Sequence, residues 1–423
     1  MPTRRHILQS SALLAAAPLV GLDAGETQPS ALPPSIAALQ SMKGQVRPIT
    51  TSEREQRLER ARQLMRENKI AALFLAGGTS LNYFTGVRWG NSERLFATVV
   101  LVSGKSFCIC PSFEESRARE QLNMGPLESA DVLTWHEDES PYPLLAVGLQ
   151  NARISTGTLG VDERTPFVFA DSFAQASPGI KIVSATPVTA GCRMVKSDHE
   201  LELMRIANTA TLKVYEAVFR ALTPGMTAQQ ASSLITAAYG QVGFRGEASF
   251  EVGAYSALPH GSVAPQVIRD GAPVIVDDGC TVEGYQSDIT RTFVLGKASD
   301  RMKRVFDIVH RAQHAALEAA RPGVACQAVD AAARKVIADA GFGPDYKFFS
   351  HRVGHGIGMD GHEWPYLVRG NTLPLVPGMT FSDEPGVYIP GEFGVRLEDD
   401  MFITHDGARL FTPQSPSLEQ PFG

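Results

Sequence analysis

The chain has 423 residues, of which 43% are hydrophobic and 20% charged, an ordinary globular composition at a length that exceeds one hydrophobic core. Its formal net charge of −6 does not indicate the excess of basic residues that is typical of nucleic-acid-binding proteins. No apolar run reaches the roughly eighteen residues that span a bilayer. These properties predict a two-domain protein with no nucleic-acid partner and no membrane span.

Residues 1–30 have the pattern of an export signal. The pair Arg4 and Arg5 precedes a polar stretch and the alanine-rich apolar run Ala12–Leu22. This order is typical of a twin-arginine signal peptide. We expect cleavage within residues 17–25, a tether reaching to about Ser41, and a mature bacterial protein that is periplasmic or extracellular. The alternative is a basic tail followed by chance alanines.

Residues 45–190 alternate helical and strand signals, which predicts a small α/β domain. We expect a charged helix over Glu53–Asn68. Strands are expected over Ile70–Ala76, Phe96–Val102 and Phe107–Cys110.

A long helix is predicted to begin at Ser197, at the entrance of a second domain that spans residues 195–415. Ser197 and Glu200 have the spacing of a capping box. Apolar residues then keep helical spacing at Met204, Ala207, Thr211, Val214 and Val218.

The second domain contains an internal repeat, because the pattern of Pro224–Phe244 recurs in Pro322–Phe342. Each copy reads as a turn, an alanine-rich helix and a Gly-Phe stop. Each is followed by a histidine segment and an acidic hairpin. The repeat predicts two similar halves, with helices packed outside a central antiparallel sheet.

Five possible metal ligands follow one another in this domain: Asp277, Asp288, His355, Glu384 and Glu398. Four carboxylates and one imidazole form a hard, oxygen-rich set that suits two divalent cations of the manganese type. Two such ions balance the four carboxylate charges. Water that bridges them is acidic enough to attack as hydroxide near neutral pH, so the set predicts a hydrolase.

The local sequence supports these ligands. Asp277 ends an apolar strand and Asp288 begins another, so we expect the two to face each other across a hairpin. Glu384 and Glu398 repeat that arrangement. His355 lies among glycines, which let the backbone come close to a crowded centre.

The five cysteines do not form a disulfide framework. Their number is odd and one pair is separated by a single residue, which predicts reduced, buried thiols. Thiolate is a poor match for a carboxylate-rich metal site, so we interpret Cys280, close to Asp277, as core packing. The cysteines are Cys108, Cys110, Cys192, Cys280 and Cys326.

Several segments together resemble the signature of the pita-bread metallopeptidases, and within them the Xaa-Pro peptidases, prolidase and aminopeptidase P. The resemblance covers roughly residues 50–415. It implies an α+β fold in which a smaller α/β domain precedes a pita-bread catalytic domain. It also implies hydrolysis of the peptide bond that precedes proline, with two divalent ions, manganese or alternatively cobalt or zinc. The segments are Leu258–Gly261, Ser287–Thr292, Gly354–Gly358 with His362 and Glu363, Glu384–Tyr388 and Val395–Asp399.

The resemblance also implies how the metal ligands are shared. Asp277 would hold one ion, His355 and Glu384 the other, and Asp288 and Glu398 would bridge both. The family spacing selects Asp277 over its neighbour at position 278, whose role stays open.

Four further residues would act on the substrate by the same resemblance. His260 and His362 would bind the scissile carbonyl and donate to the oxyanion that develops on it. Arg396 would hold a substrate carboxylate, and Tyr388 would lie near the bridging hydroxide. Glu384 would also shuttle a proton from the bridging water to the leaving amine.

The N-terminal domain of the family leans over a neighbouring protomer's active site. The aromatic segment Tyr83–Trp89 is suited to form such a wall, with Trp89 near the opposite cleft and available to substrate. We therefore expect a homodimer or homotetramer.

Two alternatives are weighed against the Xaa-Pro peptidase. A metal-free or binding-only member of the fold would have replaced the ligands, and this chain keeps all five. A generic aminopeptidase would cut without regard to proline. Whether the substrate is a dipeptide or a longer proline-containing peptide stays open, as does the preferred residue before proline.

Overall fold

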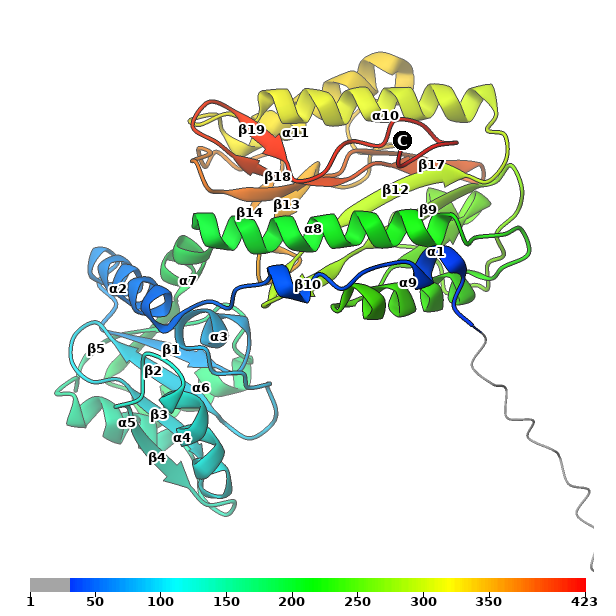
Figure 1. Cartoon of the computed structure of the whole chain (residues 1–423). Coiled ribbons are helices and arrows are strands. Elements are labelled where there is room, and N and C mark those ends of the chain that lie inside the picture. Colours follow the sequence, from blue (N-terminus) through cyan, green and yellow to red (C-terminus); the bar gives the residue numbers. More distant parts are fainter. Residues whose placement is uncertain (1–30) are drawn as a thin grey trace, which may run out of the picture. The chain divides into compact units, whose positions relative to one another are not determined.

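The computed structural model describes residues 31–423, and residues 34–423 form one compact unit (Figure 1). The predicted twin-arginine signal lies outside the described residues. Within residues 31–423, no helix combines the length and the apolar character needed to cross a membrane.

The segment from Pro34 onward is not the tether that we predicted. It forms a short helix, α1 (Pro34–Ala37), in which Ile36 is fully buried. The hydroxyl of Ser35 donates to the carbonyl of Ala217, 2.7 Å away, and the amide of Met42 donates to the carbonyl of Val242 at 2.9 Å. The tether prediction was wrong here because two apolar side chains, Ile36 and Met42, are enough to dock a polar segment on the catalytic domain.

The N-terminal domain is built on a six-stranded mixed sheet in the order β4-β3-β2-β1-β5-β6. Strand β2 pairs antiparallel with both β1 and β3, and the other neighbouring pairs are parallel, so β2 alone runs against the other five strands. The strands are β1 (Ala72–Ala76), β2 (Ala97–Leu101), β3 (Phe107–Pro111), β4 (Asp131–Trp135), β5 (Gly157–Val161) and β6 (Ile180–Ser184). The helices are α2 (Thr51–Glu67), α3 (Thr79–Thr85), α4 (Glu115–Asn123), α5 (Tyr142–Asn151), α6 (Phe167–Ala176) and α7 (Thr186–Arg193). The predicted helix and three strands are all present.

The catalytic domain begins with the predicted long helix, α8. The side chain of Ser197 accepts from the amide of Glu200, and the Glu200 carboxylate accepts from the Ser197 amide at 2.7 Å, which completes the capping box. Figure 1 shows α8 in green and α10 in yellow, with strands of the domain running between them. The helices are α8 (Asp198–Phe219), α9 (Ala228–Val242), α10 (Asp300–Ala319) and α11 (Cys326–Ile337).

The sheets of this domain are antiparallel, as predicted. Strands β12-β9-β8 form one sheet and β14-β13-β15-β18-β19 another. Two smaller sheets are β16-β17 and β11-β10-β7. In the first half the strands are β7 (Arg245–Gly246), β8 (Ser249–Val252), β9 (Pro273–Asp278), β10 (Cys280–Val282), β11 (Tyr285–Gln286) and β12 (Ile289–Val294). In the second half they are β13 (Gly354–Gly356), β14 (Glu363–Leu367), β15 (Thr380–Asp383), β16 (Gly386–Ile389), β17 (Phe393–Arg396), β18 (Asp399–Ile403) and β19 (Ala408–Leu410).

The repeated segments have matching ends. Helix α9 stops at Gly243, with φ of 89°, and the helical segment after α11 turns at Gly341, with φ of 88°. Only glycine adopts this left-handed conformation without steric cost. The Gly-Phe stop is therefore a structural feature of both halves.

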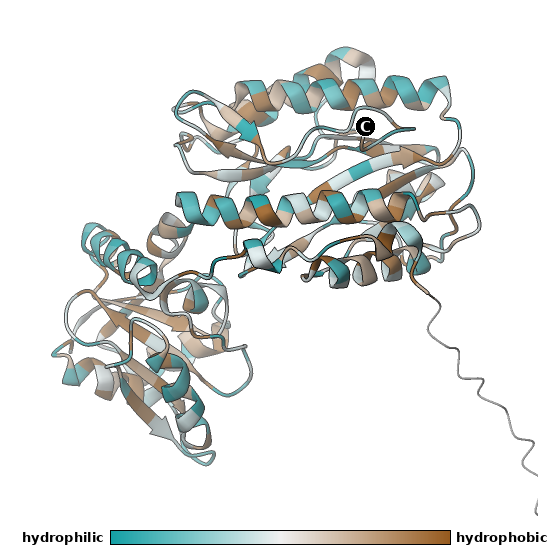
Figure 2. Ribbon diagram, in the orientation of Figure 1, coloured by the Kyte–Doolittle hydropathy of each residue, from teal (hydrophilic) through white to brown (hydrophobic). Residues whose placement is uncertain are grey.

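Each domain has its own apolar core. In the N-terminal domain two clusters of buried side chains cover the two faces of the sheet, and its strands are largely hydrophobic, whereas α2 is mostly hydrophilic (Figure 2). All five cysteines are buried and free, as predicted. The Cys280 thiol is 3.5 Å from the carbonyl of Ala207, within the core behind the metal-ligand strands.

Candidate active site

The five predicted metal ligands come together in the catalytic domain. Their donor atoms fall into overlapping groups whose members lie within 4.8 Å of one another. One group is Asp277, Asp288 and Glu398, and another is His355, Glu384 and Glu398. Glu398 belongs to both, as expected of a bridging ligand. A third group joins Asp288 and His355 to a residue that we had not predicted as a ligand, His362.

The first pair of acids is placed by β9 and β12. Asp277 lies opposite Thr290 in the register, and Asp288 comes just before β12, so the two acids are diagonal rather than directly opposed. The Thr290 hydroxyl lies 2.6 Å from Asp277 and 2.5 Å from Glu398. Thr290 therefore holds one acid from each half of the domain in place.

His355 depends on a close approach of two strands. A Cβ on Gly354 would lie 2.0 Å from the carbonyl oxygen of Ser382, so only glycine fits there. The amide of His355 donates to the Ser382 hydroxyl at 3.0 Å, and that hydroxyl lies 3.2 Å from Glu384. The glycine spacing seen in the sequence has this packing cause.

The tautomer of His355 suits a metal ligand. Its Nδ1 is 3.1 Å from the carbonyl oxygen of Gly356, which can only accept a hydrogen bond. Nδ1 therefore carries the proton, and the free lone pair of Nε2 points toward Glu384 at 3.4 Å and Asp288 at 3.8 Å. Imidazoles oriented by a carbonyl in this way are the usual metal-binding form.

The electrostatics also fit a bound cation. Burial raises the pKa of Glu384 to about 8, with Arg396 opposing the shift and Asp277 adding to it. Burial and the charge of Asp277 hold the pKa of Asp288 well above its usual range. Burial and His362 lower the pKa of His355 to about 3, so its imidazole is neutral. Crowded carboxylates beside a neutral imidazole are stabilised when divalent ions balance their charge.

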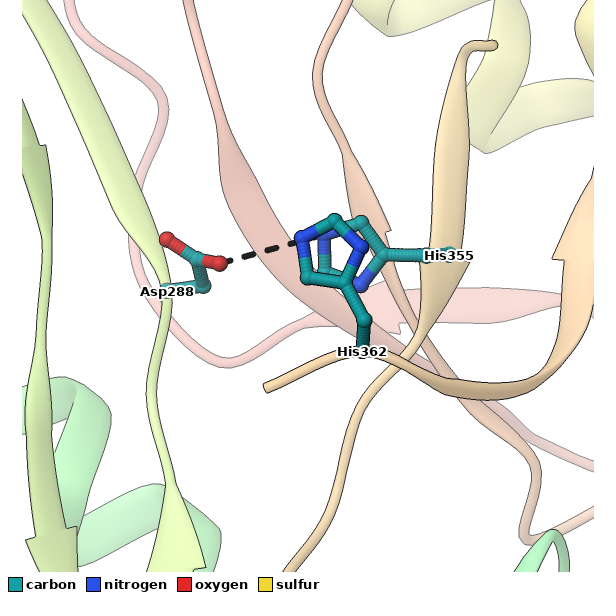
Figure 3. A group of neighbouring side chains, drawn as sticks. All are labelled: Asp288, His355 and His362. Carbon is teal, nitrogen blue, oxygen red and sulfur yellow. Dashed lines mark ion pairs between the residues drawn. The ribbon is translucent and has the colours of Figure 1, made fainter. Parts of the chain in front are cut away.

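The two predicted oxyanion donors lie at the edge of this centre. The ring of His362 is stacked on that of His355, with centroids 3.6 Å apart and both rings facing Asp288 (Figure 3). His260 is exposed, in the loop whose preceding carbonyl, that of Pro259, accepts from Arg396 at 2.7 Å. Their catalytic roles stay predictions.

Arg396 is engaged by the protein itself. It forms an ion pair with Asp277, and its Nε donates to Thr290 at 3.1 Å. One terminal nitrogen donates to the hydroxyl of Tyr388 at 3.0 Å. The predicted role of Arg396 in holding a substrate carboxylate stays a prediction, but these contacts show that it orients a metal ligand.

A histidine that the sequence analysis did not select, His351, continues this network. Its Nδ1 donates to the carbonyl of Arg352 at 2.8 Å, so its Nε2 accepts from the Tyr388 hydroxyl at 2.7 Å. Burial and Arg396 lower its pKa to about 3, which keeps the ring neutral.

Arg352 was also missed. Its guanidinium lies 4.3 Å from the centre of the Tyr366 ring, and its charge lowers the pKa of both His355 and His362. Within residues 31–423 its guanidinium takes part in no ion pair and no hydrogen bond. The sequence HRVGH at residues 351–355 was the available signal, since it places both residues within four positions of His355.

Two predicted positions lie away from the ligand cluster. Asp278 has φ of 132°, and its carboxylate accepts from the next amide, that of Gly279, at 2.9 Å. It shapes the end of β9 and gives no sign of metal binding. The indole of Trp89 stacks on Phe96 with ring centroids 3.9 Å apart, inside the N-terminal domain of its own chain, so its contact with a neighbouring cleft stays a prediction.

Comparison with known proteins agrees with this site. The model of metallopeptidase family M24 matches residues 202–405, and that of the creatinase/prolidase N-terminal domain matches residues 57–195. A probable dipeptidase PepE of Mycobacterium tuberculosis is 38% identical over 345 residues, covering 80% of this chain and 89% of that protein. An Xaa-Pro dipeptidase of Lactobacillus delbrueckii subsp. lactis is 31% identical over 368 residues, covering 86% and 98%.

A solved structure extends the agreement to the fold. The crystal structure of dipeptidase PepE from Mycobacterium ulcerans superimposes with a TM-score of 0.82 at 35% identity, covering 88% of this chain and 99% of that one. The predicted pita-bread fold with a preceding α/β domain is thereby confirmed. The ligand cluster, the two matched domains and the extent of these similarities show that the chain belongs to metallopeptidase family M24, whose members hydrolyse peptides with divalent metal ions.

Proposed function

We propose that this metallopeptidase hydrolyses Xaa-Pro dipeptides. Relatives that align over most of their length are named Xaa-Pro dipeptidases, in Lactobacillus and in Pyrococcus furiosus. A bond to proline has no N–H, so a peptidase that must hydrogen-bond that proton cannot cut it. A carbonyl attacked by hydroxide, with imidazole donors for the oxyanion, does not require the proton.

Arg352 is the observation that favours a dipeptide over a longer peptide. In Xaa-Pro the free carboxylate follows directly after the proline ring, so a cation close to the reacting centre can bind it. The Arg352 guanidinium lies 4.3 Å from the centre of the Tyr366 ring, and Tyr366 is the cross-strand partner of His355. Within residues 31–423 this guanidinium forms no ion pair. A planar guanidinium with free donors suits a carboxylate. A longer peptide would place a neutral amide there and leave this charge unpaired.

The residues divide the reaction between them. The cluster of Asp277, Asp288, His355, Glu384 and Glu398 would hold two divalent cations, which would supply an acidified water as the nucleophile. We propose manganese, because the ligands are mostly hard oxygens.

Glu384 is the proton carrier in this proposal. Its side chain is only 14% exposed, and its carboxylate lies 3.4 Å from Nε2 of His355, at the centre of the ligand cluster. It accepts the proton from the water and returns it to the proline nitrogen as that nitrogen leaves. His260 and His362 donate to the oxyanion, while Arg396 keeps Asp277 in place.

Comparing dipeptides and tripeptides tests the substrate. With manganese restored to chelated enzyme, we expect Ala-Pro to be cleaved at least tenfold faster than Ala-Ala and than Ala-Pro-Ala. Equal rates for Ala-Pro and Ala-Ala would favour a generic aminopeptidase. A higher rate for Ala-Pro-Ala would favour an aminopeptidase P-like enzyme instead.

The carboxylate contact has its own test. Arg352→Met should raise KM for Ala-Pro by roughly tenfold and leave KM for Ala-Pro-amide unchanged, since a charge-assisted bond contributes about 1.5–3 kcal/mol. Arg369→Met is a matched control, because Arg369 is exposed and pairs with Asp345. Equal effects on the acid and the amide would show that Arg352 does not bind the carboxylate.

We also propose where and in what form the enzyme works. The twin-arginine pattern of residues 1–30 supports export to the periplasm or beyond, after the metals are loaded in the cytoplasm. The aromatic segment around Trp89 supports a homodimer or homotetramer.

A further inference from the structure

The loop that carries His362 is held from both domains. Residues 357–362 connect β13 to β14, and on the catalytic side the amide of Gln286 donates to the carbonyl of Gly358 at 2.8 Å. On the other side the side chain of Met359 packs against the buried cluster of the N-terminal domain. The loop therefore lies where the two domains meet.

Asp360, at the centre of this loop, collects donors from three places in the N-terminal domain. The Thr79 hydroxyl donates to it at 2.7 Å from the start of α3. Arg193, at the end of α7, donates at 2.5 Å, and Arg164 lies 3.2 Å away on the loop after β5. The side chain of Asp360 is only 10% exposed, so these contacts are made in a largely dry environment.

Glu363, next to His362, is held in the same way. Its carboxylate pairs with Arg193 and, at 2.6 Å, with Lys196 in the segment between the domains. Arg193, Lys196 and Glu363 are each no more than 6% exposed. Two buried cations and two buried acids balance in charge, so removing any one of them would leave a buried ion unpaired and endanger the fold.

Arg164 differs from this buried set. Its side chain is 56% exposed, so it can be replaced without leaving an unpaired charge in the core. Besides pairing with Asp360, its second terminal nitrogen donates to the backbone carbonyl of His362 itself, at 2.8 Å. Arg164 therefore links the N-terminal domain directly to His362, the residue predicted to stabilise the oxyanion.

We propose that Arg164 is a positioning residue that transmits the placement of the N-terminal domain to His362. One terminal nitrogen of the Arg164 guanidinium pairs with Asp360, and the other donates to the His362 carbonyl. The two contacts fix the backbone on both sides of position 361. Because His362 stacks on the ligand His355, a small shift of this backbone moves its imidazole relative to the reacting carbonyl. The N-terminal domain thereby takes part in turnover without contributing a group that touches the substrate.

The test is a double-mutant cycle between Arg164→Met and His362→Ala in the metal-loaded full-length enzyme, measured with Ala-Pro. We expect Arg164→Met to lower kcat on the order of tenfold, with KM and metal content unchanged. In the His362→Ala background the same substitution should change nothing further, because its effect passes through His362. Arg164→Lys should restore part of kcat, since one ammonium cannot make both contacts.

The control is Arg153→Met, an exposed arginine of the same domain that forms no ion pair within the described residues. It should leave kcat unchanged. Hydrogen exchange gives a reading independent of activity: amides of residues 357–363 should exchange faster in Arg164→Met and at the wild-type rate in Arg153→Met.

Three results would overturn the proposal: an unchanged kcat in Arg164→Met, an equal loss in the His362→Ala background, or loss of metal from Arg164→Met. The positioning role goes beyond the proposed substrate. If wild-type enzyme does not cleave Ala-Pro, the substrate proposal fails, and the cycle is run with the dipeptide that is cleaved fastest.

Discussion

The imidazole of His362 lies parallel to that of His355, with ring centroids 3.6 Å apart and planes 16° from parallel. One ring has its free nitrogen directed at the carboxylates, and the other covers it from the solvent side. Two histidines in direct contact can therefore have separate tasks, one in holding metal and one in turnover. Substitutions can separate these tasks.

Replacing a bridging acid should remove metal and activity together. Asp288→Ala or Glu398→Ala takes a donor from the shared centre of the cluster, so both ions lose a ligand. His362→Ala should keep both ions and lower kcat by roughly a hundredfold, as expected for one oxyanion donor. Metal content by mass spectrometry and steady-state kinetics measure the two effects. Loss of metal from His362→Ala would identify His362 as a ligand.

The close approach at Gly354 predicts a sensitive backbone position. Gly354→Ala puts a methyl group against the carbonyl of Ser382, so we expect a loss of about 1–3 kcal/mol in unfolding free energy, together with weaker metal binding at His355. Gly240→Ala, in α9, is the control, since its methyl group meets no atom within 4 Å. It should be neutral or slightly stabilising. A fully stable, metal-replete Gly354→Ala enzyme would contradict the packing described above.

Stability should depend on pH through Glu53. Burial opposes its ionisation, but hydrogen bonds from Thr50 and from His199, which lies 2.7 Å away on α8, outweigh it and lower the pKa of Glu53 to about 2. A lowered pKa stabilises the fold above the unfolded value, near 4.5, and that contribution disappears as pH falls toward 2.

Glu53→Gln should therefore cost about 1 kcal/mol at pH 7, after allowance for solvent screening, and almost nothing near pH 2. Thermal unfolding across this range measures the difference from wild type. Glu59→Gln, an exposed site on the same helix, should show a much smaller change at every pH. A constant difference between Glu53→Gln and wild type would exclude the linkage.

Quaternary structure is testable through Trp89. We expect light scattering to give a dimer or tetramer, and Trp89→Ala to lower activity more than Phe113→Ala, another aromatic change in the same domain. A strictly monomeric enzyme of full activity would refute the role assigned to Trp89 on a neighbouring cleft.

We expect export to depend on the pair Arg4 and Arg5. Arg4→Lys with Arg5→Lys should retain the enzyme in the cytoplasm of a bacterium that has the twin-arginine pathway, as followed by cell fractionation and peptidase assay. Arg47→Lys should be exported as wild type. Unchanged export of the double variant would point to a different route.

Local sequence patterns correctly predicted the structural features that depend only on residues close together in the sequence. The capping box at Ser197 and the glycines around His355 were recognisable because each effect acts within a few residues. The strand register of Asp277 against Thr290 was not, since it depends on the turn falling at Glu283 and Gly284. The register set by that turn runs unbroken through β10–β11 and β9–β12 and places Asp277 opposite Thr290 rather than Asp288.

Contacts between distant segments escaped the sequence analysis. Arg164 and Asp360 belong to different domains, and an exposed arginine followed much later by an aspartate has no periodicity to detect. His351 and Arg352 could be seen beside His355 in the sequence. Their roles could not, because these depend on folded contacts: His351 accepts from the Tyr388 hydroxyl, and the Arg352 guanidinium has no hydrogen-bond partner within residues 31–423. The segment from Pro34 to Ser41 was misjudged for a similar reason, as the buried position of Ile36 is decided by helices that come much later in the chain.

Because all five thiols are buried, we expect the folded protein to react slowly with cysteine reagents. A single cysteine introduced at an exposed site would therefore be the one reactive position, with no need to remove native residues from the two cores. A pair of such sites, one in each domain, could carry fluorescent or spin labels. The distance between them, followed during turnover, would report directly whether the N-terminal domain moves while the peptide bond is cut.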